Sequence, residues 1–190
     1  MSVQLIVYPQ WYDGIPNGIN YTGTTTSEML SDNTNWTTAN VGAGILSSPS
    51  NAAQEAVNSF YPNLSVGSWK GYFNLNGGGA NGGVVGTNGS LILQFYSAGV
   101  FQMLGGLNVG ASYDITITWD VSAAYPVKVR MFTATNLNST TIASPNALGV
   151  WTGSFIATSQ NKDIFCIDYF NEGNNTTILE ASITGSSQGV

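Results

Sequence analysis

Histidine is absent from this 190-residue sequence, and cysteine occurs once, at Cys166. The lack of histidine removes the commonest general base, the serine–histidine type of catalytic triad and the usual zinc ligands. A single cysteine excludes an internal disulfide and a metal cluster built from cysteines. We therefore interpret Cys166 as a small apolar residue on a buried strand.

Charge is also scarce, because only 7% of the residues are Asp, Glu, Lys or Arg. Four basic residues stand against ten acidic ones, which gives a formal net charge of -6. So few cations cannot neutralise a phosphate backbone, and we expect no nucleic-acid partner. No apolar run approaches the roughly 18 residues of a membrane span. The start of the chain lacks the basic region and long apolar core of a secretion signal. We therefore expect no membrane partner and no signal-directed secretion.

The residues that are abundant favour strands joined by turns. The sequence is rich in Gly, Ser, Thr and Asn, and 43% of its residues are apolar. This balance is typical of β-proteins and differs from the Glu- and Lys-rich composition of helical ones. The length suits one domain with a sizeable core.

The clearest strand covers residues 113–121. Polar residues fill its even positions, so one face is apolar and the other polar, as in a half-buried strand. The apolar face carries Tyr113, Ile115, Ile117, Trp119 and Val121. Shorter patterns of the same kind predict strands at residues 3–8, 69–75, 91–95, 100–104, 126–133, 148–158, 163–170 and 176–184.

A helix is predicted only near Ala52 to Ser59, where apolar residues recur at helical spacing and Pro62 prevents extension. The fold class that follows is all-β: a single jelly-roll β-sandwich over residues 28–190, preceded by a short apolar arm over residues 1–27. We expect its core to contain Ile115, Ile117, Trp119, Val129, Phe155, Ile167 and Ile183.

From about residue 91 the order of features resembles the non-catalytic carbohydrate-binding modules of families four and nine and the wider galactose-binding-like jelly rolls. The matching pieces are residues 101–113, the strands around Asp120 and Val127, residues 151–158 and residues 178–183. The resemblance implies a jelly roll without catalysis. It also implies a structural calcium held by Glu180, with Asp32 as the nearest second ligand; otherwise we expect no cofactor.

Sugar binding would use an aromatic ring with amides or charges beside it. One set of side chains is predicted to face away from the apolar sides of its strands: Lys70, Tyr72, Asn74, Gln94, Tyr96 and Arg130. These residues are our carbohydrate-binding candidates. An ordinary solvated face or a subunit interface is the alternative.

An enzyme is not expected. A glycosidase needs two carboxyl groups about 5 to 9.5 Å apart. Asp114 and Asp120 share a strand face but lie roughly 20 Å apart, and Asp163 and Asp168 are predicted to point to opposite faces. We therefore expect no hydrolytic activity, and weak binding or no binding of soluble glycans.

The N-terminal arm carries an aliphatic and aromatic cluster that a monomer would leave exposed. Its assembly-interface candidates are Leu5, Val7, Tyr8, Trp11 and Tyr12. The arm can fold back onto its own sandwich or add a strand to a neighbouring surface; we predict the second.

The sequence hypothesis is thus a non-enzymatic structural protein of a bacteriophage virion, as a capsid decoration or in the tail. We expect a homo-oligomer assembled in the host cytoplasm, with other virion proteins and possibly glycans as partners. The alternative is a carbohydrate-binding or lectin-like domain of a polysaccharide-recognition system.

Overall fold

Antiparallel strands dominate the computed structural model. It describes residues 2–4, 20–23, 27–30, 38–39, 52–61, 64–67, 69–74, 82–87, 90–120, 127–133, 139–143 and 149–186. Within these ranges there are twelve strands and one α-helix, and the strands pair antiparallel in two sheets. The predicted all-β sandwich with one short helix is confirmed. In the same ranges, no helix has the length and apolar character needed to cross a membrane.

The elements lie in the following order along the chain. The first half contains β1 (Ser2–Gln4), β2 (Asn20–Gly23), β3 (Ser27–Leu30), β4 (Thr38–Ala39), α1 (Ala52–Phe60), β5 (Trp69–Asn74) and β6 (Gly82–Thr87). The second half contains β7 (Ser90–Met103), β8 (Ser112–Trp119), β9 (Lys128–Phe132), β10 (Ser139–Ala143), β11 (Val150–Ile156) and β12 (Ile164–Ser186).

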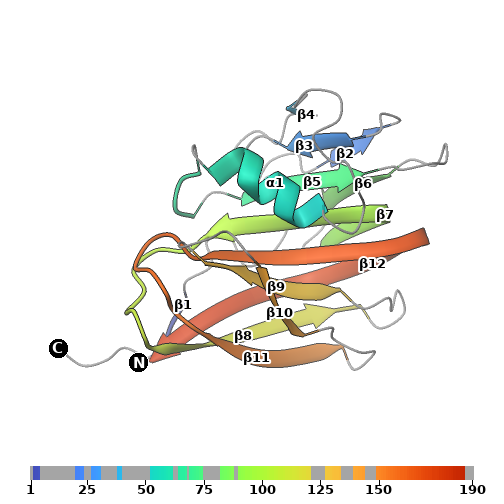
Figure 1. Ribbon diagram of the computed structural model, residues 1–190. Coiled ribbons are helices and arrows are strands. Elements are labelled where there is room, and N and C mark those ends of the chain that lie inside the picture. Colours follow the sequence, from blue (N-terminus) through green and yellow to red (C-terminus); the bar gives the residue numbers. More distant parts are fainter. Residues whose placement is uncertain are drawn as a thin grey trace.

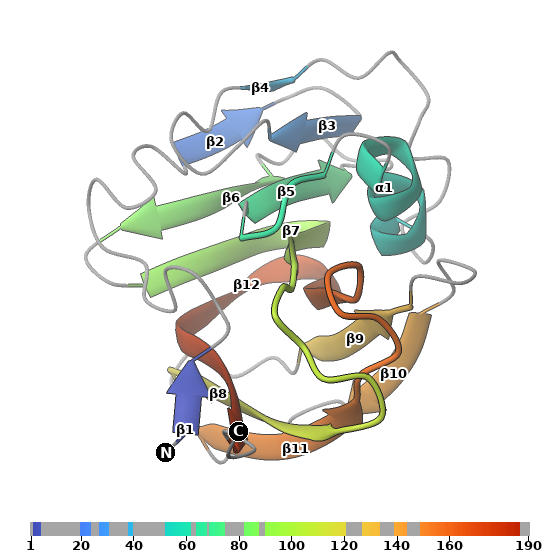
Figure 2. The same ribbon diagram turned by 90° about the vertical axis from the view of Figure 1, so that its left-hand side faces the viewer.

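Two long strands, β7 and β12, pair along both of their halves, and β12 continues from the first sheet into the second (Figure 1). Residues 97–102 of β7 pair with β5 and with the start of β12, in a sheet ordered β4-β3-β5-β7-β12-β9-β10. Residues 91–94 pair with β6 and with a later part of β12. The rest of β12 continues to β8, which pairs with β11. Figure 2 shows β12 curving between the two sheets.

This continuity differs from the sequence prediction. Residues 91–95 and 100–104 were expected to form two strands, but β7 runs without a break through Gly99. The predicted strands at residues 163–170 and 176–184 are likewise one strand, β12, whose pairing shifts register between Asn171 and Asn175. The hydrophobic alternation breaks at this register shift, because the buried positions of β7 change from Leu91 and Leu93 to Ala98 and Val100 across it.

The main core lies between the two sheets. β8 alternates buried and more exposed residues over its whole length, as predicted, although Val121 lies outside the described residues. The predicted core residues are all at most 8% exposed, which confirms the prediction: Ile115, Ile117, Trp119, Val129, Phe155, Ile167 and Ile183. They join one apolar cluster with residues of β7 and β9.

The helix covers the outer face of the first sheet (Figure 1). Ala53, Ala56 and Val57 lie at helical spacing on one side of α1 and are buried. They pack in a second apolar cluster with residues of the sheet, including Phe101 and Cys166. The part of the first sheet beneath α1 is therefore buried on both faces, and the helix predicted near Ala52 to Ser59 is confirmed.

Two short segments of the predicted arm pair with the chain's own sandwich. β1 pairs with β12, with Ser2 opposite Ser186, and β2 pairs with β6. For these segments the structure shows the fold-back alternative. The interface candidates Leu5, Val7, Tyr8, Trp11 and Tyr12 lie outside the described residues, so their docking role stays a prediction.

Candidate functional site

The six predicted sugar-binding residues lie on three strands of the first sheet. Lys70, Tyr72 and Asn74 belong to β5, Gln94 and Tyr96 to β7, and Arg130 to β9. The side chains of Asn74, Gln94 and Tyr96 lie outside the described residues. The structure therefore tests only part of this predicted surface.

Tyr72 is fully buried, which contradicts its predicted role as an exposed stacking platform. Its ring packs in the cluster beneath α1, with a centroid 6.4 Å from that of Phe101. Its hydroxyl donates a hydrogen bond to Oδ1 of Asp168. The prediction was wrong because strand alternation assigned this face of β5 to solvent, whereas α1 covers it.

Arg130 forms an ion pair with the same buried carboxylate. Its Nε donates to Oδ2 of Asp168 over 2.9 Å, and its Nη2 lies 2.8 Å from that oxygen. The side chains of Arg130 and Asp168 are 13% and 6% exposed. Arg130 is therefore held by an internal ion pair, and its predicted contact with a ligand stays a prediction. Tyr72, Arg130 and Asp168 form an internal network that joins β5, β9 and β12.

Burial governs ionisation in this network. It raises the pKa of the Asp168 carboxyl, an effect that the Arg130 guanidinium opposes. Burial and the nearby Asp168 carboxylate raise the pKa of Tyr72 well above 10.0. Burial likewise raises the pKa of the Cys166 thiol well above 9.0. Tyr72 and Cys166 therefore keep their protons at neutral pH and are poor nucleophiles.

Gly99 makes the network possible. Tyr72 is directly opposite Gly99 in the register of β5 and β7. A Cβ at position 99 would lie 2.4 Å from the Tyr72 hydroxyl oxygen and 2.6 Å from the carbonyl oxygen of Ile167. The glycine thus leaves the space that the tyrosine side chain occupies.

No cluster of three or more metal-ligating side chains occurs in the described part of the chain. Glu180 lies on β12 opposite Thr118, and Asp32 is outside the described residues. The predicted calcium site therefore stays a prediction.

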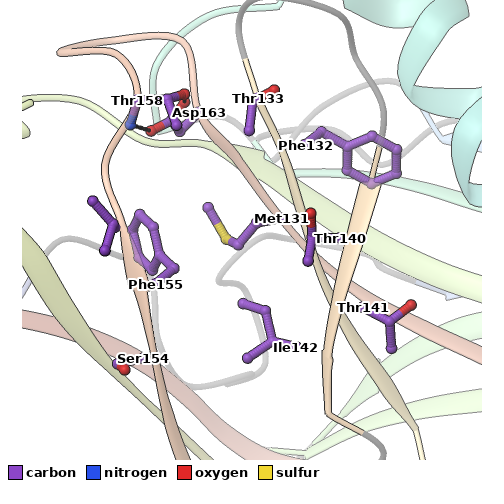
Figure 3. A pocket seen from close by; sticks show the side chains of 11 residues that line it. Met131, Phe132, Thr133, Thr140, Thr141, Ile142, Ser154, Phe155, Thr158 and Asp163 are labelled. Carbon is purple, nitrogen blue, oxygen red and sulfur yellow. Dashed lines mark hydrogen bonds between the residues drawn. The ribbon is translucent and has the colours of Figure 1, made fainter. Parts of the chain in front are cut away.

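A cleft of about 480 Å³ opens between the β9–β10 pair and β11. Its apolar floor is made by Met131, Ile142 and Phe155, whose side chains face the same space from three strands (Figure 3). Met131 and Phe155 are buried and belong to the main core, against which Ile142 packs. The floor is therefore fixed by the packing of the sandwich.

Hydroxyl groups surround this floor. They come from both sides of the cleft and belong to Thr133, Thr140, Thr141, Ser154 and Thr158. Among the described lining residues none is Lys or Arg, and Asp163 is the one carboxylate. Hydroxyls both donate and accept hydrogen bonds. The cleft thus combines an apolar surface with uncharged polar groups, the usual make-up of a small-ligand pocket.

Asp163 is held within the protein and closes one end of the cleft. It is 1% exposed, and its Oδ2 accepts hydrogen bonds from the backbone N–H groups of Thr158 and Ser159 over 2.7 and 3.2 Å. Its Oδ1 accepts a hydrogen bond from the Thr158 hydroxyl (Figure 3). This carboxylate shapes the turn between β11 and β12.

The neighbouring connection from β7 to β8 fixes the same end. The N–H of Leu104 donates to the carbonyl of Asp163, and the N–H of Gly110 donates to that of Ala157. Gly110 has a φ of 85°, a conformation that favours glycine. The Tyr113 hydroxyl accepts from the N–H of Asn108, while its ring stacks on Phe155 with centroids 5.6 Å apart. The cleft wall is therefore rigidly supported.

Sequence reasoning did not find this cleft. Phe155 was predicted only as core, and Met131 was seen as part of an alternating strand. Ile142 lies at a register shift in β10, between Thr141 and Ala143. No sequence pattern predicted this shift. The run of threonines at residues 140–141 was the one available signal.

Comparisons with known proteins give remote structural likenesses only. No family model matches the sequence, and no curated protein matches it. The xylan-binding module CBM15 has a TM-score of 0.42 and 10% identity, over 64% of this chain and 92% of that module. The C-terminal family 22 carbohydrate-binding module of Clostridium thermocellum Xyn10B has a TM-score of 0.38 and 13% identity, over 68% and 93%.

Tailspike protein 4 of bacteriophage CBA120 is another structural neighbour, with a TM-score of 0.37 and 9% identity. The match covers 50% of this chain and 15% of the tailspike chain. A xylanase fragment of Clostridium thermocellum, with its CBM22 and catalytic modules, is matched over 24% of its length. This chain therefore spans a small part of these two proteins. All these TM-scores are below 0.5, so the likenesses carry no argument about function.

Proposed function

We propose that the protein is a non-enzymatic binding module that holds neutral carbohydrate in the cleft between the β9–β10 pair and β11. The observation that carries this proposal is the cleft itself, with an apolar floor and a rim of hydroxyls. A sugar ring has C–H groups on its faces and hydroxyls at its edge, so it matches both surfaces. The volume of about 480 Å³ is within the range of about 300–1,000 Å³ that small-ligand pockets occupy.

The carboxylates support a role without catalysis. Asp163 accepts hydrogen bonds from the turn between β11 and β12. Asp168 is paired with Arg130 on the face of the first sheet that α1 covers. Asp114 is exposed on the outer face of β8. Hydrolysis of a glycosidic bond needs two carboxyl groups facing one substrate. These three residues face different parts of the molecule.

We expect Thr140→Leu to weaken glycan binding by at least about tenfold, or about 1.4 kcal/mol. Thr140 is exposed and lines the cleft, and leucine would replace its hydroxyl with apolar bulk at the mouth. A neutral-glycan array would identify a ligand, and calorimetry would compare the variant with the wild type. Assays for released reducing ends should stay negative.

Val150→Leu is the matched control. Val150 lies on β11, the edge strand on the other side of the cleft, is 53% exposed and does not line the cleft. It should bind like the wild type. Equal binding by Thr140→Leu and the wild type would exclude the cleft as the site. Absence of any bound glycan on the array would reject the function.

We further infer that this module serves on a bacteriophage particle, where the N-terminal arm joins it to a neighbouring subunit. The support is the apolar cluster in residues 1–27, a segment whose one charged side chain is Asp13. Clusters of this kind normally mark an interface. The two proposals rest on different residues, so they can fail independently.

Replacing Tyr8, Trp11 and Tyr12 by serine should convert an oligomer into a monomer while the sandwich stays folded. Light scattering after gel filtration measures the mass, and circular dichroism follows the fold. Detection of the wild-type protein in purified phage particles by mass spectrometry would support the virion role. A monomeric wild type that is absent from particles would reject it.

A further inference from the structure

A second hollow lies on the outer face of the second sheet. It has a volume of about 470 Å³ and is lined by Asp114, Thr116, Thr152, Gly153, Ser154 and Thr184. We call it the outer groove. It crosses three strands, since these residues belong to β8, β11 and β12. Apart from Ser154, its lining residues are not part of the cleft described above.

The register of the strands explains its polar lining. Thr184 of β12 is opposite Asp114 of β8, which is opposite Ser154 of β11. This row runs across the strands and spans two strand spacings, about 10 Å. A second row beside it contains Thr116 and Thr152. The alternation that buries Ile115 and Ile117 turns these polar residues outward.

Ser154 joins the outer groove to the cleft. It lines both cavities, and it lies at the middle of β11. Among the described strands, β11 pairs only with β8, so its other side is an edge of the second sheet. The row Thr184–Asp114–Ser154 therefore leads across the sheet to this edge, beyond which the cleft begins.

We propose that the outer groove and the cleft form one track over the edge strand β11, and that this track binds an internal segment of a linear neutral glycan. This inference rests on the proposed function and adds the ligand's class. A single sugar would fill one cavity at a time. A chain can occupy both, because Ser154 lines both cavities and is exposed.

The chemistry of the track selects against acidic chains. No Lys or Arg is among the described residues that line either cavity. Asp114 is exposed, and its carboxylate accepts hydrogen bonds from sugar hydroxyls but repels other carboxylates. Threonine and serine hydroxyls supply both donors and acceptors along the rest of the track. A neutral polyhydroxylated chain satisfies these groups.

The test uses the full chain with a series of neutral gluco-, xylo- and manno-oligosaccharides, from disaccharide to octasaccharide. The wild-type affinity for the best series should rise by at least about tenfold from the shortest to the longest member. The variant Asp114→Ala/Thr184→Val removes the polar groups at the far end of the track. It should bind short members like the wild type and lose the gain with length.

The variant Glu180→Ala/Thr118→Val is the matched control. It also replaces one acidic residue and one threonine on the same two strands, at directly opposed positions, but these residues line neither cavity. It should keep the full gain with length. Thermal unfolding of both variants checks that the sandwich is intact.

The outcomes separate this inference from the proposed function. An affinity independent of chain length, or a gain that Asp114→Ala/Thr184→Val retains, overturns the track and leaves the cleft as a site for short glycans. Binding that both double variants lose equally also overturns the track. Absence of binding by every oligosaccharide overturns the track and the proposed function together. Acidic oligosaccharides that bind as tightly as neutral ones overturn the assigned ligand class.

Discussion

Replacing Trp119 by alanine is expected to lower the free energy of unfolding by about 3–5 kcal/mol. Trp119 is the last residue of β8 and is 4% exposed. It belongs to the core cluster between the two sheets, together with Ile178, which is directly opposite on β12. Truncation would leave a cavity that these strands cannot close without breaking their pairing. Denaturant unfolding followed by circular dichroism measures the change.

Val150→Ala provides the control for this prediction. Val150 lies on β11 opposite Thr118 and is 53% exposed. Its truncation should change the free energy of unfolding by no more than about 0.5 kcal/mol. A loss of similar size in both variants would show that burial of Trp119 is not what stabilises this end of the sandwich.

The variant Asp168→Ala is expected to lose about 3–5 kcal/mol of unfolding free energy. It removes the acceptor of the Tyr72 hydroxyl and the partner of the Arg130 guanidinium, which is 13% exposed. A largely buried charge without its counter-charge costs more than the ion pair contributes. Urea titrations of the variant and the wild type measure the loss.

A triple replacement tests whether the loss of unfolding free energy in Asp168→Ala comes from the Arg130 charge left without a partner. Tyr72→Phe/Arg130→Met/Asp168→Leu removes all three polar members and fills the same space with apolar groups. Its stability should lie close to that of the wild type, because buried ion pairs are often replaceable by apolar residues. A triple variant as unstable as Asp168→Ala would show that the network is essential in itself.

Asp168→Asn should also change the dependence of stability on pH. Burial raises the pKa of Asp168 above its ordinary value of 3.8, and Arg130 opposes this shift. As the pH rises above 3.8, the unfolded chain therefore releases this proton before the folded protein does. The contribution of Asp168 to stability falls across that window, up to its raised pKa. The asparagine variant should lack this fall when unfolding is measured at several pH values.

The sandwich and its core were predictable because each rests on local alternation. Ile115, Ile117 and Trp119 repeat at every second position of β8, and that period alone selects the face turned toward the other sheet. The helix was predictable for the same reason, from the spacing of Ala53, Ala56 and Val57.

The candidate site was not predictable, because its features depend on which elements cover one another. Alternation placed Tyr72 on a polar face, and nothing in β5 shows that α1 lies over that face. The ion pair of Arg130 with Asp168 depends on the neighbouring positions of β9 and β12. The cleft requires β10 and β11 to meet at the edges of two sheets, a relation between segments that no local pattern encodes.

The passage of β12 through both sheets determines how the protein can unfold. Neither sheet can separate from the other unless β12 breaks its hydrogen bonds to β7 or to β8. The described strands should therefore melt as one cooperative unit, without a stable half-folded intermediate. Pairings such as Ser2 with Ser186 also join residues far apart in the sequence. Closing such long loops before their contacts form is slow, so we expect folding to be slow compared with that of helical proteins of similar size.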